Sequence, residues 1–293
     1  MSNTYSRPIA LFTYMLLASA TFAIRPSALI AQTDTTHHSP WTHTLVGTLN
    51  LSEASYTNWT AGGDNTLAYV ALLAGKSEDN PVSATWTNSY KLTFGQARLG
   101  DHGLRKTDDE INLESLFKYK LDSTLNPYFA ATFKSQFAPG YKYDKNDSAT
   151  QVSKFFDPAY FTEAVGALYT PNPYFKTRLG VALREIITTQ FTQYADDPTT
   201  PKVESTLVQG GIESVSELAL PIDDNLLLAS KLELFDPFEH FQQIVTRSET
   251  GITAKITKLI IVNLNLVLLN DPMVTPRTQV KQTLAIGFTY AIL

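Results

Sequence analysis

Two histidines have acidic neighbours and could act as catalytic bases. His102 lies in LGDHGLRKTDD among three aspartates, and His240 lies in FDPFEHFQ after an aspartate and a glutamate. A base also needs a nucleophile within hydrogen-bond reach. Neither histidine comes with a GxSxG elbow, and the chain has no HExxH sequence. We therefore assign no catalytic residues. A hydrolase that acts on lipid stays an alternative function.

Acidic runs in polar segments could hold Ca²⁺, which prefers oxygen ligands. YDKND (143–147) comes nearest, but it lacks the glycine and the distal glutamate of an EF-hand loop. The chain contains no cysteine, no zinc-type ligand spacing and no Walker loop. We expect solvated loops here, and we predict neither a metal nor a cofactor.

The remaining charged residues recur at every second position of apolar segments. In ATWTNSYKLTFG (84–95), Trp86, Tyr90 and Phe94 share one face, while Lys91 and the threonines share the other. A repeat of two is typical of β-strands. No helical periodicity follows residue 40. We predict about twelve strands, near 41–54, 66–77, 84–95, 109–120, 127–137, 159–170, 174–187, 205–219, 226–235, 243–256, 259–270 and 278–292.

Loop length alternates along these strands. Connections after odd-numbered strands are long and polar, and those after even-numbered strands are short. An even strand number with short periplasmic turns and long extracellular loops is typical of outer-membrane barrels, whose tilted strands span roughly 9–11 residues. We predict an all-β, transmembrane antiparallel β-barrel of about twelve strands. A soluble antiparallel protein with one face in water is the alternative.

In such a barrel the polar face lines the lumen. The lumen-lining candidates are Lys91, Glu114, Lys134, Arg178, Arg184, Glu213, Lys231, Glu233, Arg247 and Glu249, and the same face carries Glu110, Lys118, Lys120, Glu217, Lys255 and Lys281. Cations modestly outnumber carboxylates, which favours a narrow pore with a mild preference for anions. Alternatively, the opposite charges pair and plug the lumen.

The apolar face should meet outer-membrane lipid. Its aromatic residues often fall near strand ends, where interfacial girdles form. The girdle candidates are Trp41, Tyr69, Trp86, Tyr119, Tyr128, Tyr169, Phe288 and Tyr290. The net charge of −5 gives no reason to expect nucleic-acid binding.

The N-terminus has the order of an export signal. Arg7 precedes the uncharged stretch PIALFTYMLLASATFAI, and small residues follow. We interpret residues 1–31 as a signal peptide cleaved between 20 and 31, residues 32–40 as a flexible mature N-terminus, and residues 41–293 as one barrel domain. An N-terminal membrane anchor is the alternative. The predicted location is the outer membrane of a diderm bacterium.

The stretch YTNWTAGGDNT (56–66) forms the first long loop. Its glycines permit positive φ, and its Asp and Asn favour turns. Trp59 suits a membrane interface. We interpret the loop, with Asn58, Trp59, Gly62, Gly63 and Asn65, as a rim turn with an aromatic anchor.

These five residues resemble the start of an uncharacterised barrel family, domain of unknown function 3078. The resemblance continues through Trp86-Thr87-Asn88, Tyr90, Phe94-Gly95, Lys106-Thr107-Asp108-Asp109, Phe133-Lys134-Ser135-Gln136-Phe137, Gly140-Tyr141 and Ser153-Lys154-Phe155-Phe156-Asp157-Pro158-Ala159-Tyr160. It implies an exported outer-membrane barrel, and it implies no reaction, catalytic residue or cofactor.

The last strand resembles the C-terminal signal that barrel-assembly machinery recognises. Gly287, Tyr290 and Ile292 have the spacing of that signal, although the chain ends in Leu293 where many such proteins end in Phe or Trp. We therefore expect the assembly machinery to be a partner. The functions to weigh are a passive pore for small solutes, a structural or surface-binding barrel with a plugged lumen, and a rim hydrolase that acts on lipid.

Overall fold

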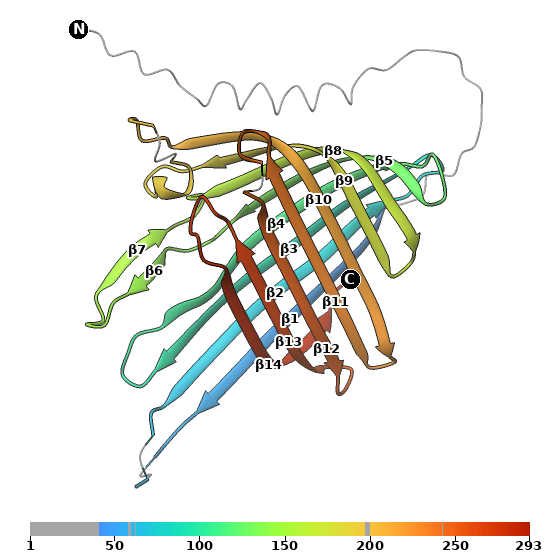
Figure 1. Ribbon diagram of the computed structural model, residues 1–293. Helices are drawn as coiled ribbons and strands as arrows, with labels where there is room; N and C mark the ends of the chain where they lie inside the picture. Colours follow the sequence, from blue (N-terminus) through green and yellow to red (C-terminus); the bar gives the residue numbers. More distant parts are fainter. Residues whose placement is uncertain (1–40, 58–59, 62, 197–199, 242) are drawn as a thin grey trace. The chain divides into compact units, whose positions relative to one another are not determined.

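The computed structural model describes residues 41–293 except 58, 59, 62, 197–199 and 242 (Figure 1). Residues Ser39–Leu293 form one compact unit. The predicted signal peptide and polar tail lie outside the described residues. No helix in the described part of the chain is long and apolar enough to cross a membrane.

Twelve strands form a closed barrel in the ring order β1-β14-β13-β12-β11-β10-β9-β8-β5-β4-β3-β2. All neighbouring strands are antiparallel, so the predicted architecture and strand number are confirmed. Their bounds are β1 Thr42–Ala54, β2 Thr66–Asp79, β3 Ala84–Leu99, β4 Arg105–Tyr119, β5 Leu125–Ser135, β8 Ala159–Asn172, β9 Phe175–Ile187, β10 Thr206–Asp223, β11 Leu226–Pro237, β12 Val245–Lys255, β13 Ile260–Asn270 and β14 Gln279–Ala291.

Long connections gather at one end of the barrel, which we call the loop end. They span residues 55–65, 100–104, 136–158, 188–205, 238–244 and 271–278. The opposite end, the turn end, carries the short connections 80–83, 120–124, 173–174, 224–225 and 256–259. The long polar segment expected over 96–109 is mostly strand, because β3 and β4 continue beyond the predicted bounds and leave only residues 100–104 as a loop.

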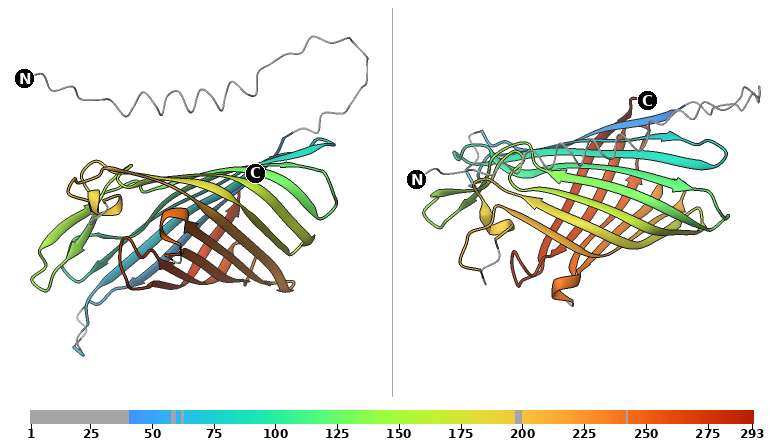
Figure 2. Two further views of the ribbon diagram at one scale, coloured as in Figure 1. Left: turned by 45° about the horizontal axis from the view of Figure 1, so that its top comes forward. Right: turned by 90° about the horizontal axis from the view of Figure 1, so that it is seen from above.

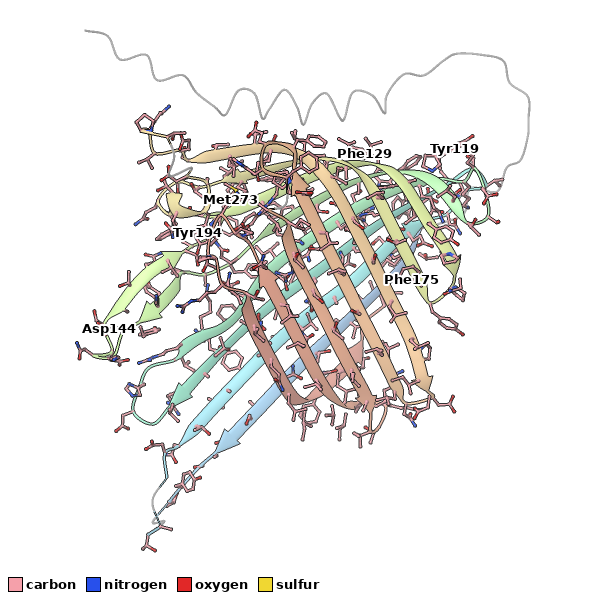
Figure 3. The ribbon with its side chains drawn as sticks, in the orientation of Figure 1. Tyr119, Phe129, Asp144, Phe175, Tyr194 and Met273 are labelled. Atoms are coloured by element: carbon pink, nitrogen blue, oxygen red, sulfur yellow. The ribbon has the colours of Figure 1, made fainter. Side chains whose placement is uncertain are left out.

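The loop between β5 and β8 contains a separate hairpin that the sequence interpretation missed. Its strands are β6 (Gly140–Tyr143) and β7 (Ala149–Ser153), and they form their own two-stranded sheet (Figure 1). Two short 3₁₀ helices, η1 (Thr192–Tyr194) and η2 (Phe238–His240), also lie in long loops. Asp144 is at the tip of the hairpin (Figure 3), where its carboxylate accepts the backbone N–H groups of Asn146 and Ser148. It therefore shapes a turn.

Strand register explains why the two faces of the barrel differ. Lys91 pairs with Asn112, and the next residue, Tyr90, pairs with Leu113, so polar and apolar pairs alternate. Paired residues share a face of the sheet. Apolar side chains on the outward face stay open, and Val165, Leu179 and Val181 are 60%, 59% and 56% exposed.

Tyr128 corrects the predicted aromatic girdle. Tyr128 and Lys134 lie an even number of residues apart on β5, so they share its inward face. Tyr128 is only 3% exposed and packs in a cluster with Leu116 and Phe235. Gly180 makes room for it, because a Cβ there would come within 2.6 Å of the Tyr128 hydroxyl. The repeat of two decided the orientation of this residue, and its position near a strand end did not.

The ring closes through a short seam between β1 and β14. Only five residue pairs join these strands, from Val46–Ala291 to Asn50–Gly287, whereas the β1–β2 pairing runs over the whole of β1. Among the described residues, 51–54 of β1 and 279–286 of β14 have no pairing across the seam. Both segments lie toward the loop end, and Figure 2 shows β1 and β14 meeting near the C-terminus and separating from there.

We expect the unpaired part of the seam to exchange backbone hydrogen faster than the paired part. Amides of residues 279–286 that point toward β1 have no acceptor there, and unprotected amides exchange readily. Hydrogen–deuterium exchange of the refolded barrel should show faster uptake over 279–286 than over 287–291. Equal protection of the two segments would mean that the seam closes along its full length in solution.

Candidate functional site

Nine of the ten lumen-lining candidates take part in two groups of ion pairs inside the barrel. Together with Glu110 they form what we call the ion-pair layer. Its five cations are Lys91, Lys134, Arg178, Lys231 and Arg247, and its five carboxylates are Glu110, Glu114, Glu213, Glu233 and Glu249. The formal charges of the layer therefore cancel.

One half of the layer is a closed ring of four side chains. Lys91 pairs with Glu110 at 3.2 Å, and Glu110 pairs with Arg247 at 2.7 Å. Arg247 lies 3.9 Å from Glu249, which in turn pairs with Lys91. Each member has two partners, so the loss of one contact leaves every charge with another.

The other half is an alternating chain of charges. It runs in the order Lys134, Glu233, Lys231, Glu114, Arg178, Glu213, and its last four contacts measure 3.2, 3.4, 3.0 and 3.0 Å. Arg178 is 4% exposed, and its guanidinium carbon lies 5.6 Å from the centroid of the Tyr128 ring. Buried charges of this kind persist only when they are paired.

The layer joins opposite walls of the barrel. Glu110 is on β4 and Arg247 is on β12, and in the ring order β5, β8, β9, β10 and β11 separate these strands on one side. On the other side β3, β2, β1, β14 and β13 separate them. A contact of 2.7 Å between diametrically placed strands means that the side chains cross the whole lumen.

On the loop side of the layer, the β13–β14 loop reaches into the lumen. Buried Asp271 accepts a hydrogen bond from Arg184 of β9 at 2.9 Å, and the Gln209 amide nitrogen lies 3.3 Å from the Met273 sulfur. Figure 3 shows Met273 and Tyr194 at the loop end. Arg184, the tenth candidate, thus binds this loop and not the layer. Alternation could not reveal Asp271, because it lies outside a strand.

On the turn side, a cavity of about 960 Å³ extends from the layer toward the short turns. Lys91, Glu114, Lys231 and Glu249 of the layer line it, together with residues near the turn end such as Lys118. We call this cavity the turn-end vestibule. The lumen therefore consists of an open polar chamber, a layer of paired charges and a loop-filled mouth.

The motif loop near residue 60 fastens two hairpins together. The Asn65 side-chain oxygen accepts the backbone N–H of Tyr56 at 2.7 Å, and the Asn65 carbonyl oxygen accepts the N–H of Gly100 at 2.8 Å. Gly63 has a φ of 143°, and a Cβ there would lie 2.9 Å from the Tyr56 ring. Asn58, Trp59 and Gly62 lie outside the described residues.

Two aspartates of the later motifs anchor loop-end backbone. Asp109 accepts the N–H groups of Phe137 and Ala138 at 2.8 and 2.9 Å. Asp157, 1% exposed, accepts the Thr189 hydroxyl at 2.6 Å and the Gln190 N–H at 2.9 Å. Burial alone raises the pKa of the Asp157 carboxyl, but these hydrogen bonds outweigh it and hold the pKa below its ordinary value.

His102 and His240 lie in exposed loop-end positions. His102 contacts Asp147 at 3.2 Å, and Arg105 pairs with the same carboxylate. His240 lies in η2. Within the described residues, no serine or threonine hydroxyl bonds to either ring, and no three acidic or histidine side chains are grouped as metal ligands.

A closed antiparallel barrel with an apolar exterior and a charged interior defines a transmembrane β-barrel protein. Residues 51–141 of the chain match the profile of a family described as a protein of unknown function, DUF3078. The match confirms the resemblance seen in the sequence over those residues, and the motifs from Ser153 to Tyr160 lie beyond it. No curated protein matches the chain.

Several solved barrels are similar in structure. The COG4313 outer membrane channel from Pseudomonas putida F1 is 13% identical, with a TM-score of 0.40, over 92% of this chain and 100% of that chain. The translocator domain of autotransporter NalP from Neisseria meningitidis is 10% identical, with a TM-score of 0.36, over 96% and 95%. The NanC porin is 10% identical, with a TM-score of 0.37, over 85% and 97%. At these values, the fold assignment rests on the strand pairing of this chain itself.

Removing one charge from the layer should destabilise the barrel. Arg178→Met leaves Glu213 and Glu114 short of a buried partner, and breaking a buried pair costs about 3–5 kcal/mol. Denaturant unfolding of the refolded barrel measures the loss. Lys142→Met, on the exposed hairpin, should change the free energy of unfolding by no more than about 0.5 kcal/mol. Equal effects of the two substitutions would show that Arg178 is solvated.

Asp157→Asn should loosen the loop of residues 136–158. The substitution places an NH₂ group against N–H donors, so pepsin should cleave this loop faster than in the wild type, while the exposed control Asp101→Asn should leave cleavage unchanged. Because the folded pKa is lowered, wild-type protection should hold above the ordinary aspartate pKa of roughly 3.9 and disappear as the pH falls through the lowered value. Unchanged cleavage of D157N would contradict this anchoring role.

Proposed function

We propose that this protein is an outer-membrane channel that passes small polar or charged solutes, with the ion-pair layer as its narrowest part. The outward apolar face supports membrane insertion, and a closed ring is the form of sheet that lipid permits. The export signal expected in residues 1–31 supports an outer-membrane location. By the usual orientation of such barrels, the turn end faces the periplasm and the loop end faces outward.

The observation that carries the proposal is that flexible side chains, each with its own partner, obstruct the lumen between the vestibule and the loop end. Lys91, Glu110 and Arg247 each contact more than one opposite charge. A passing ion or polar solute can therefore replace one partner while the displaced group keeps another. Such a layer favours small currents and discrimination by charge.

The test compares single-channel currents of the wild type with those of a variant in which the diametrical pair is removed without changing the net charge. The double substitution Glu110→Gln and Arg247→Gln should increase the size of the current steps or the open fraction in a planar bilayer. The double control Lys142→Gln and Asp144→Asn changes the exposed hairpin and keeps the net charge. It should leave the current unchanged.

Folding of each protein is checked first by its heat-dependent shift in gel migration. Barrels that fold but carry no current, in both the wild type and the layer variant, would contradict the channel. They would favour a barrel with a plugged lumen that acts through its surface. The Arg184–Asp271 contact, which holds the β13–β14 loop inside the mouth, is the observation that supports this second candidate.

A further inference from the structure

The turn-end vestibule carries positive charge that the rest of the lumen does not neutralise. Its charged lining comprises six lysines (Lys76, Lys91, Lys118, Lys120, Lys176 and Lys231) and four glutamates (Glu78, Glu114, Glu217 and Glu249). The excess of two cations contrasts with the neutral ion-pair layer that forms the inner boundary of the chamber.

Every glutamate in the vestibule has a lysine partner. Glu249 pairs with Lys91, and Glu114 lies 3.4 Å from Lys231, so the layer uses both of these carboxylates. Near the turns, Glu78 pairs with Lys76, and Glu217 lies 3.0 Å from Lys176. These four pairs leave Lys118 and Lys120.

Neither of these two lysines has a carboxylate partner within the described part of the chain. The Lys120 ammonium donates a hydrogen bond to the Pro81 carbonyl oxygen at 2.6 Å, which is a neutral acceptor. Lys120, Lys176 and Lys76 act on the Lys118 ammonium as like charges, and Glu78 acts on it as an opposite charge. Like charges held together in a chamber attract anions from solution.

On the loop side of the layer, two cations of the lumen have carboxylate partners. Arg184 is paired with Asp271, and Lys281 is paired with Asp108 at 2.7 Å. Lys118 and Lys120 lie at the turn end, where β4 leads into the 120–124 connection. An anion that enters from this end meets Lys118 and Lys120 before it meets the layer.

We propose that the turn-end vestibule is a binding site for a small anion of the phosphate class, with Lys118 and Lys120 as its main ligands. Each ammonium offers three donors on a flexible stem, which suits an oxyanion with several acceptor oxygens. A multiply charged oxyanion would neutralise both surplus cations at once, whereas the paired lysines would keep their carboxylates. The inference deepens the proposed function by naming the solute class, but the charge arrangement stands without any current.

Inorganic phosphate is the probe, and calorimetric titration of the refolded barrel in lipid-free detergent is the measurement. We expect saturable binding to the wild type and at least a tenfold weaker affinity for the double variant Lys118→Gln and Lys120→Gln. The matched control, Lys142→Gln and Lys145→Gln, removes the same charge from the exposed hairpin and should bind phosphate as the wild type does. The double variant Lys118→Arg and Lys120→Arg keeps the charge and should retain binding.

No saturable binding to a folded wild type would overturn the inference. So would equal affinities of the vestibule variant and the hairpin control. Currents recorded on the same preparations separate this result from the channel: a barrel that conducts without binding phosphate refutes the anion site alone, and one that binds phosphate without conducting refutes the channel alone. If the glutamine variant does not refold, loss of binding in the arginine variant would count against the site, and retained binding would support it.

Discussion

The pairing of buried charges across the lumen is the interaction on which the rest of this structure depends. Charged side chains placed inside a barrel are costly unless each finds an opposite charge. Here five cations and five carboxylates satisfy one another, and the contact between Glu110 and Arg247 joins strands on opposite sides of the ring. Apolar side chains such as Val165, Leu179 and Val181 can then face outward, because the charged ones have partners inside.

The layer also divides the interior into regions with different electrostatics. The layer itself is neutral, and on its loop side Arg184 pairs with Asp271. On its turn side, Lys118 and Lys120 have no carboxylate partner among the described residues. A mild anion preference of the whole lumen was the expectation from the sequence. In the structure the surplus lysines lie at the turn end, whereas the ion-pair layer narrows the lumen. The residues that attract anions are therefore different from those that narrow the passage.

Much of the fold could be predicted, because polar and apolar residues alternate along each strand with a repeat of two. It placed Lys91 and Arg247 on the inward face and also fixed Tyr128 there, against its assignment to the girdle. The sequence does not predict which cation pairs with which carboxylate, because that depends on which strands lie opposite each other once the ring closes. The β6–β7 hairpin and Asp271 were missed because both lie in loops, where alternation gives no signal.

The most direct test of the account is a double-mutant cycle on unfolding stability, built from Glu110→Gln, Arg247→Gln and the two combined. If Glu110 and Arg247 pair across the lumen, each single substitution is destabilising, and the double variant loses at least about 1 kcal/mol less stability than the sum of the two single losses, as contacting charges do. Losses that add to within about 0.5 kcal/mol would mean that the two side chains do not meet across the lumen.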